Sequence, residues 1–199
     1  MSARDVILGV LRAQRLPAVE LPSLAGDWIR YADRVAQFRS ALVLAAGSLV
    51  ELDAAVVDVE AAVAALPEHE LRTGRRLSWL GGGSGDGLPE PHAFDTLELL
   101  ITAARLGVAE NGAVWIDEAL VPIRAALFLA QHVIVALPRA ALLDNMHDAY
   151  EHLGARVGHT GYGCFVSGPS KTADIEQALV VGAHGPRSLT VVLHGPPAP

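Results

Sequence analysis

The side chains best suited to bind a ligand or to take part in catalysis lie together in one short segment late in the sequence. They are two hydroxyls, the single lysine of the chain and two acids: Ser170, Lys171, Thr172, Asp174 and Glu176. Hydroxyls and backbone N–H groups at the start of a helix suit a carboxylate or a phosphate, and lysine adds positive charge. The acids are candidates for general-base chemistry. The segment therefore predicts a site for a small anionic molecule, with a capped turn as the alternative.

This segment is expected to follow a strand. Residues 164–166 have the apolar character of a buried strand, and Gly168 and Pro169 end it, because proline fixes φ and has no N–H donor. In open α/β sheets, the loops at the carboxyl ends of strands line the ligand crevice. The polar residues that follow therefore occupy a place where ligands bind.

Two further candidates lie in predicted turns. His184 precedes Gly185 and Pro186, and its imidazole titrates near neutral pH, so it is a candidate proton relay; fixing the turn by a hydrogen bond is an equal alternative. Glu110 lies beside an Asn-Gly turn, where a carboxylate either accepts local amides or faces a ligand. The sequence leaves both alternatives open for both residues.

Composition excludes several classes of protein. One cysteine, Cys164, allows neither an internal disulfide nor an iron–sulfur cluster held by this chain alone, since clusters need about four thiolates. A net charge of −7 argues against a nucleic-acid surface. The longest apolar stretch, residues 121–138, contains Arg124, Gln131 and His132, which argues against a membrane span. The charged N-terminus does not resemble a signal peptide, so we expect a cytoplasmic protein.

Two patterns that suggest a cofactor are weak. Acids and histidines occur together at Asp144, His147, Asp148, Glu151 and His152, but they are better explained as the solvated face of a helix, and no metal site is expected. The glycine-rich residues 81–87 lack the Gly-Lys-Ser/Thr of a phosphate loop and precede prolines rather than a helix. We expect a mobile loop there, with lid motion as its most credible role.

Hydrophobic periodicity predicts alternating strands and helices. Ser2 is expected to cap a first helix, which a proline-containing connector joins at about residue 22 to one domain over residues 23–199. The predicted helices span residues 2–14, 28–38, 53–66, 94–106, 120–130 and 139–153, although Ile101 and Thr102 leave a strand possible in the fourth. The predicted strands span residues 41–44, 76–80, 113–117, 132–137, 164–166 and 189–194. This alternation predicts an α/β fold whose mainly parallel sheet is covered on both faces.

The late segment also resembles a known family. Residues 167–176, 182–187 and 189–193 are similar to the C-terminal signature of the lactate-utilisation (LUD) domain family. The resemblance implies a three-layer α/β/α fold like that of ribose-5-phosphate isomerase and CoA transferases. It also marks Glu110 as a signature glutamate and includes Arg187, which joins Ser170, Lys171 and Thr172 as a substrate-binding candidate. The catalytic candidates are Glu110, Asp174, Glu176 and His184.

The resemblance implies that the protein works together with electron-carrying proteins and is not itself an electron carrier. The chain would be an accessory component of an iron–sulfur L-lactate oxidation system that converts lactate to pyruvate, with the clusters on partner proteins and no cofactor of its own. A small carboxylate or phosphate would be its ligand. The alternative, by fold analogy, is a stand-alone isomerase- or CoA-transferase-like enzyme that uses Glu110, Asp174 or Glu176 on a small acid or sugar phosphate. A scaffold without chemistry is a third possibility.

Overall fold

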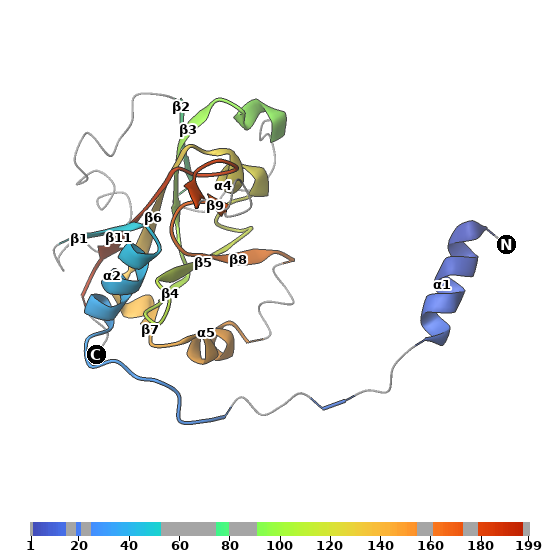
Figure 1. Cartoon of the computed structure of the whole chain (residues 1–199), viewed down its shortest axis with the longest axis horizontal. Helices are drawn as coiled ribbons and strands as arrows, with labels where there is room; N and C mark the ends of the chain where they lie inside the picture. Colours follow the sequence, from blue (N-terminus) through green and yellow to red (C-terminus); the bar gives the residue numbers. More distant parts are fainter. Residues whose placement is uncertain are drawn as a thin grey trace.

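The protein is built on a five-stranded parallel sheet (Figure 1). The computed structural model describes residues 2–14, 19–20, 25–52, 75–79, 91–154, 161–172 and 179–196. The strand order is β1-β11-β6-β3-β2, and each neighbouring pair is parallel. The strands are β1 (Ser48–Glu51), β2 (Arg75–Trp79), β3 (Leu97–Ala103), β6 (His132–Pro138) and β11 (Ser188–His194).

The central strands are apolar on both faces because both faces are covered. Alternate residues of β6 and β11, such as Val133 and Val191, belong to the main core, while Ile134 and Val192 belong to a smaller core on the opposite face. The main core is completed by Phe38 and other apolar side chains of α2 (Arg34–Leu44) and α4 (Arg124–Leu129). The prediction of a mainly parallel sheet within an α/β fold is confirmed.

A second, four-stranded sheet was not predicted. Its order is β7-β4-β5-β8, with β4 (Leu106–Val108), β5 (Ala113–Asp117), β7 (Leu142–Leu143) and β8 (Gly163–Val166). Helix α5 (Met146–Leu153) packs on it through a separate core that contains Trp115 and Leu153. The pairing of β5 with both β4 and β8 is antiparallel. This side sheet brings the end of β8 to the main sheet.

The N-terminal helix forms as predicted. Helix α1 (Ala3–Ala13) begins at Ser2, whose hydroxyl accepts the N–H of Asp5 while the Asp5 carboxylate accepts the N–H of Ser2. Two backbone donors at the helix start are thereby satisfied. None of the residues of α1 is buried, and Figure 1 shows the helix apart from the two sheets. In the described ranges, no helix combines the length and apolar character needed to cross a membrane.

Several predicted elements are wrong. Residues 41–44, predicted as a strand, lie in α2, which begins after the N-cap residue Asp33, so residues 28–33 precede the helix. Residues 94–106, predicted as a helix, form a short 3₁₀ turn (η1, Pro91–Phe94) and β3, because β3 is buried on both faces and so loses the alternation that identifies a strand. Residues 139–141 are a 3₁₀ turn (η2, Arg139–Ala141), and α5 begins only after Asn145.

The other predictions have simpler outcomes. Strands β2, β5, β6, β8 and β11 form within one residue or two of their predicted bounds, and α4 is shorter than predicted. The helix predicted for residues 53–66 and the loop at residues 81–87 lie outside the described residues. Lys171 and Thr172, predicted at the start of a helix, form the short strand β9 (Lys171–Thr172).

Candidate functional site

A hollow of about 280 Å³ lies where α4, β8 and the two central strands meet. Apolar side chains make most of its wall, and two serines and two prolines lie at the turns around it. The lining residues are Leu127, Phe128, Val133, Cys164, Phe165, Val166, Ser167, Gly168, Pro169, Ser170, Pro186 and Leu189. Its size approaches that of pockets that hold small organic molecules.

The turn after β8 is fixed by close packing. Gly168 has φ +71°, and a Cβ there would lie well inside van der Waals contact with the carbonyl oxygen of Ala45, at the end of α2. The Ser167 hydroxyl donates a 2.8 Å hydrogen bond to the carbonyl oxygen of Asn111. Glycine is required because a side chain has no room and the backbone lies in the left-handed region. This edge of the hollow is therefore tied to both α2 and the β4–β5 turn.

The described part of the predicted polar segment, residues 170–172, lies beside the hollow and pairs with a second short strand, and this strand pair is called the hairpin below. Strand β9 pairs in antiparallel fashion with β10 (Val180–Val181). The Ser170 N–H donates to Pro186 O at 2.9 Å, and Gly182 N–H donates to Ser170 O at 2.8 Å. The structure thus brings the 170–172 and 182–187 segments together. The amide array of a helix start, expected at Ser170, is replaced by turn and strand hydrogen bonds.

Side chains of this hairpin differ in where they lie. Ser170 lines the hollow, whereas Lys171 is exposed and does not, as expected when consecutive residues of an extended chain point to opposite sides. Thr172 Oγ1 lies 3.4 Å from His184 Nδ1. Arg187 is exposed, and its N–H donates to Gln131 O at 2.7 Å. Within the described ranges, neither Lys171 nor Arg187 forms an ion pair.

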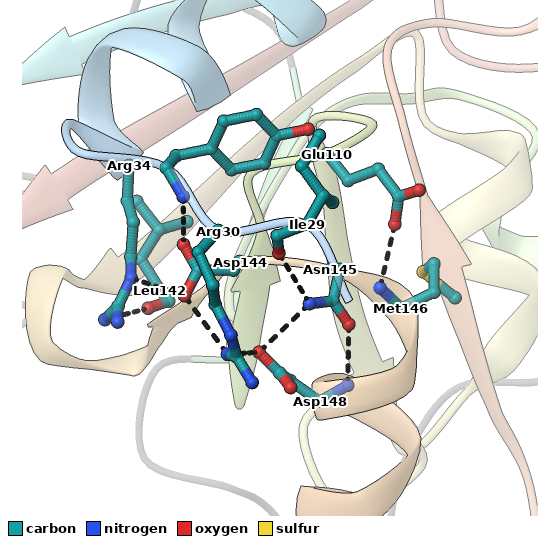
Figure 2. Close-up of polar contacts among 10 residues, drawn as sticks. Ile29, Arg30, Arg34, Glu110, Leu142, Asp144, Asn145, Met146 and Asp148 are labelled. Atoms are coloured by element: carbon teal, nitrogen blue, oxygen red, sulfur yellow. Dashed lines mark hydrogen bonds and ion pairs between the residues drawn. The ribbon is translucent and has the colours of Figure 1, made fainter. Parts of the chain in front are cut away.

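Of the three acids of the predicted site, the structure describes Glu110 alone. Glu110 lies in the turn between β4 and β5, where its Oε2 accepts a 3.0 Å hydrogen bond from the N–H of Met146 at the start of α5 (Figure 2). A carboxylate at a helix N-terminus is stabilised by the free N–H groups there. Glu110 therefore accepts a backbone amide from a distant segment, a contact that differs from the local amides of its own turn that the sequence offered as one alternative. Asp174 and Glu176 lie outside the described residues.

Cys164 is the titratable group of the hollow wall. Burial raises the pKa of its thiol, an effect that a hydrogen bond with Tyr162 partly opposes. Burial also raises the pKa of Tyr162, and the contact with Cys164 adds to that rise. Both groups are therefore neutral at physiological pH. The place of Cys164 in the wall could not be predicted from the sequence, because several residues that share the wall with it come from distant segments.

Part of the acid and histidine group at the start of α5 has a structural role. Asp144 is only 2% exposed; it accepts the Tyr31 N–H and the Arg34 Nε–H, each at 3.0 Å, and it also pairs with Arg30 (Figure 2). Burial on its own would raise the pKa of Asp144, but the Tyr31 amide and the two guanidinium groups outweigh burial and lower it. The expectation of a solvated helix face is wrong for Asp144.

The same network joins the segment before α2 to the body of the protein. Arg30 also pairs with Asp148 on α5, and the Trp28 ring stacks on His147 with 3.5 Å between ring centroids. The Asn145 side-chain amide donates to Ile29 O at 2.9 Å. In the part of the chain that the structure describes, no three His, Cys, Asp or Glu side chains are arranged to hold a metal. Ion pairs and stacking thus fasten residues 25–33 to α5.

The fold and the site define a class of α/β proteins in which a parallel sheet carries a mixed side sheet and an apolar hollow between them. Comparison with known proteins places the chain within that class. The family model described as the LUD domain matches residues 92–194, just over half of the 199 residues, and the chain belongs to the LUD domain family. The matched range contains the hollow and the hairpin.

Relatives of known name share part of their length with this chain. Lactate utilization protein C of Shouchella clausii is 36% identical over 89 residues, which cover 43% of this chain and 39% of the relative. The protein of the same name from Halalkalibacterium halodurans is 38% identical over 90 residues, which cover 43% and 39%. The chain thus spans well under half the length of these relatives.

A solved structure supports the fold. The crystal structure of a DUF162 family protein from Deinococcus radiodurans matches with a TM-score of 0.61 at 17% identity, covering 81% of this chain and 96% of that one. At this identity the likeness concerns the fold alone. It extends the match beyond the range of the family model.

Proposed function

We propose that this chain is an accessory component of an iron–sulfur L-lactate oxidation system, which converts lactate to pyruvate. The observation that supports the proposal most is the similarity of 36–38% to proteins named Lactate utilization protein C. The LUD domain match over residues 92–194 includes the segment in which the polar candidates lie. The proposal concerns participation in lactate use and a division of labour with partner proteins.

The division of labour follows from composition. Oxidation of lactate to pyruvate releases two electrons, which iron–sulfur clusters accept one at a time. A cluster needs about four thiolate ligands, and Cys164 is the single cysteine of this chain. Its thiol also has a raised pKa, which opposes metal binding as a thiolate. In this proposal, partner proteins hold the clusters.

The contribution of the chain itself is proposed to be an anion contact at the hairpin. Lys171 and Arg187 are exposed cations, each next in sequence to a residue that lines the hollow, Ser170 or Pro186. The Lys171 ammonium and the Arg187 guanidinium attract a carboxylate even though they are exposed, but screening by salt keeps this attraction modest. The hydroxyls of Ser170 and Thr172 offer hydrogen bonds to the same ligand.

Growth of a deletion strain tests the proposal. Deletion of the gene is expected to impair growth with L-lactate as the carbon source but not with pyruvate, and the wild-type gene is expected to restore it. Complementation with Lys171→Met is expected to fail in part, whereas Lys171→Arg, which keeps the charge, is expected to succeed. Normal growth of the deletion strain on lactate would refute the proposal.

A second experiment tests the partners. The tagged full-length chain, purified from cells grown on lactate, is expected to bring with it proteins whose absorbance near 400 nm reports iron–sulfur clusters. Turnover of acyl-CoA or pentose phosphates by the chain alone, abolished in Glu110→Gln, would instead support the stand-alone enzyme. Glu110→Gln is informative because the amide keeps an oxygen that accepts the Met146 N–H.

A further inference from the structure

The wall of the hollow is more apolar than a lactate site requires. Six of its twelve lining residues contribute aliphatic, aromatic or thiol side chains, namely Leu127, Phe128, Val133, Cys164, Val166 and Leu189, while the ring of Phe165 packs against Trp115 and Tyr150 in the core of the side sheet. One of the six, Phe128, is 49% exposed although it belongs to a helix whose inner face is buried. A ligand that covers a half-exposed phenyl ring beside a concave apolar wall removes apolar surface from water, which favours binding.

The volume leads to the same conclusion. At about 30 Å³ for each water molecule in the liquid, 280 Å³ is room for roughly nine waters. The one methyl group of lactate would cover a small part of this wall and leave the rest in contact with water. Apolar surface that stays in contact with water contributes nothing to affinity, so lactate would leave most of the apolar wall unused for binding.

Two hydroxyls line the hollow: that of Ser167, which is bonded to Asn111 O, and that of Ser170. Ser170 lines the hollow, and its hydroxyl has no hydrogen-bond partner among the described residues. Lys171 follows Ser170 in sequence, and Arg187 follows the lining residue Pro186; both are exposed. Ser170 and Pro186 are themselves joined by the 2.9 Å backbone hydrogen bond. The Ser170 hydroxyl is thus a polar group at the edge of a mainly apolar hollow, whereas the side chains of Lys171 and Arg187 are exposed and do not line it.

We propose that the hollow binds the tail of a monocarboxylic acid larger than lactate, a 2-hydroxy or 2-oxo acid with a branched aliphatic or aromatic group. The tail lies against Phe128 and Cys164, and the carboxylate lies at the Ser170 edge. The inference shares with the proposed function only the anion contact at the hairpin. It assigns the size and the polarity of the ligand, which the similarity to lactate-utilisation proteins does not supply.

Cys164 supplies a direct assay, because it is the only cysteine of the chain and its thiol lies in the wall. The rate of alkylation by iodoacetamide, followed by the mass of the intact protein, reports access to the hollow. The probes are L-lactate, 2-hydroxybutanoate, 2-hydroxy-4-methylpentanoate and 3-phenyllactate. Each acid is titrated at constant ionic strength, and the concentration that halves the rate gives its dissociation constant.

The expected result is protection that strengthens with the tail. Each added methylene is expected to lower the dissociation constant about fourfold, so that 3-phenyllactate binds at least tenfold more tightly than lactate. Calorimetric titration of the unlabelled protein gives an independent value. A dissociation constant that does not change along the series would overturn the inference, as would the absence of protection by every acid.

Two neighbouring residues of α4 provide a matched pair of variants. Phe128 lines the hollow, whereas Leu129 is 41% exposed and does not line it. Phe128→Ala is expected to weaken binding of 3-phenyllactate at least tenfold while changing that of lactate less than twofold. Leu129→Ala is expected to change neither more than twofold. Equal effects of the two variants would show that the hollow is not the binding site.

The outcome is separable from that of the proposed function. If no acid protects Cys164 while the deletion strain still fails to grow on lactate, the ligand assignment falls and the proposed function stands. If the acids protect as expected while the deletion strain grows normally on lactate, the assignment stands and the proposed function falls.

Discussion

Replacing Gly168 with alanine gives the sharpest test of how the hollow is held in place. The φ of +71° costs an alanine about 1–2 kcal/mol in the left-handed region. The added Cβ would also lie well inside contact with Ala45 O and 2.9 Å from the Ala45 carbonyl carbon, which are backbone atoms that cannot rotate away. Relieving such a clash by moving α2 costs about 1–3 kcal/mol more. The free energy of unfolding is therefore expected to fall by about 2–5 kcal/mol.

Gly195 provides the control, because it has φ +79° but its Cβ would meet nothing within 4 Å. Gly195→Ala is expected to cost only the conformational term, about 1–2 kcal/mol. With a urea m-value of about 2 kcal/mol/M, the unfolding midpoint would fall by about 1–2.5 M for Gly168→Ala and about 0.5–1 M for Gly195→Ala. Equal midpoints for the two variants would refute the claim that the turn after β8 is packed against the end of α2.

Three further predictions concern the polar contacts. Asp144→Asn is expected to lower the free energy of unfolding by about 2 kcal/mol. Because the pKa of Asp144 is lowered in the folded protein, this stability is present above the unfolded pKa of about 4 and is lost as pH falls through the folded pKa. In urea unfolding, the difference between wild type and variant should therefore shrink toward pH 3. Alkylation of Cys164 at pH 8 is expected to be slower than that of glutathione, and Tyr162→Phe, which removes a contact that lowers the pKa of Cys164, should slow it further; faster alkylation would contradict this. Glu110→Ala is expected to destabilise by about 1 kcal/mol and Glu110→Gln by less, in thermal unfolding; equal losses would argue against the contact with Met146 N–H.

Much of the parallel sheet could be predicted because its strands have clear ends. Strand β6 is a continuous apolar run that closes at Pro138, and β11 follows Gly185 and Pro186. The prediction failed for strand β3 because nearly all of its residues are buried. Leu97–Ala103 therefore shows no alternation of polar and apolar positions, although the same burial stabilises the strand. Four apolar residues, 41–44, fit a strand or a helix equally well, and packing of Leu42 into the core decided for α2.

The arrangement of the segments that carry the candidate residues was predicted in part. Chain order and the turn residues correctly brought residues 170–172 near residues 182–187, but the helix expected there depended on side-chain capping alone and a hairpin formed instead. The hollow could not be predicted, since Phe128, Cys164 and Leu189 lie on three elements whose meeting depends on strand order. The link between Arg30 and Asp144 joins residues more than a hundred positions apart, a separation that no local pattern reports.

The position of β11 bears on how the protein is made. This strand lies between β1 and β6, so one of the first strands of the main sheet lacks its neighbour until residues 188–194 have left the ribosome. Parallel pairing between such distant segments is slow, and exposed strand edges invite aggregation meanwhile. Nascent chains that stop short of β11 should therefore depend on chaperones. The hollow can form only after Leu189, its last lining residue in the sequence, has been synthesised.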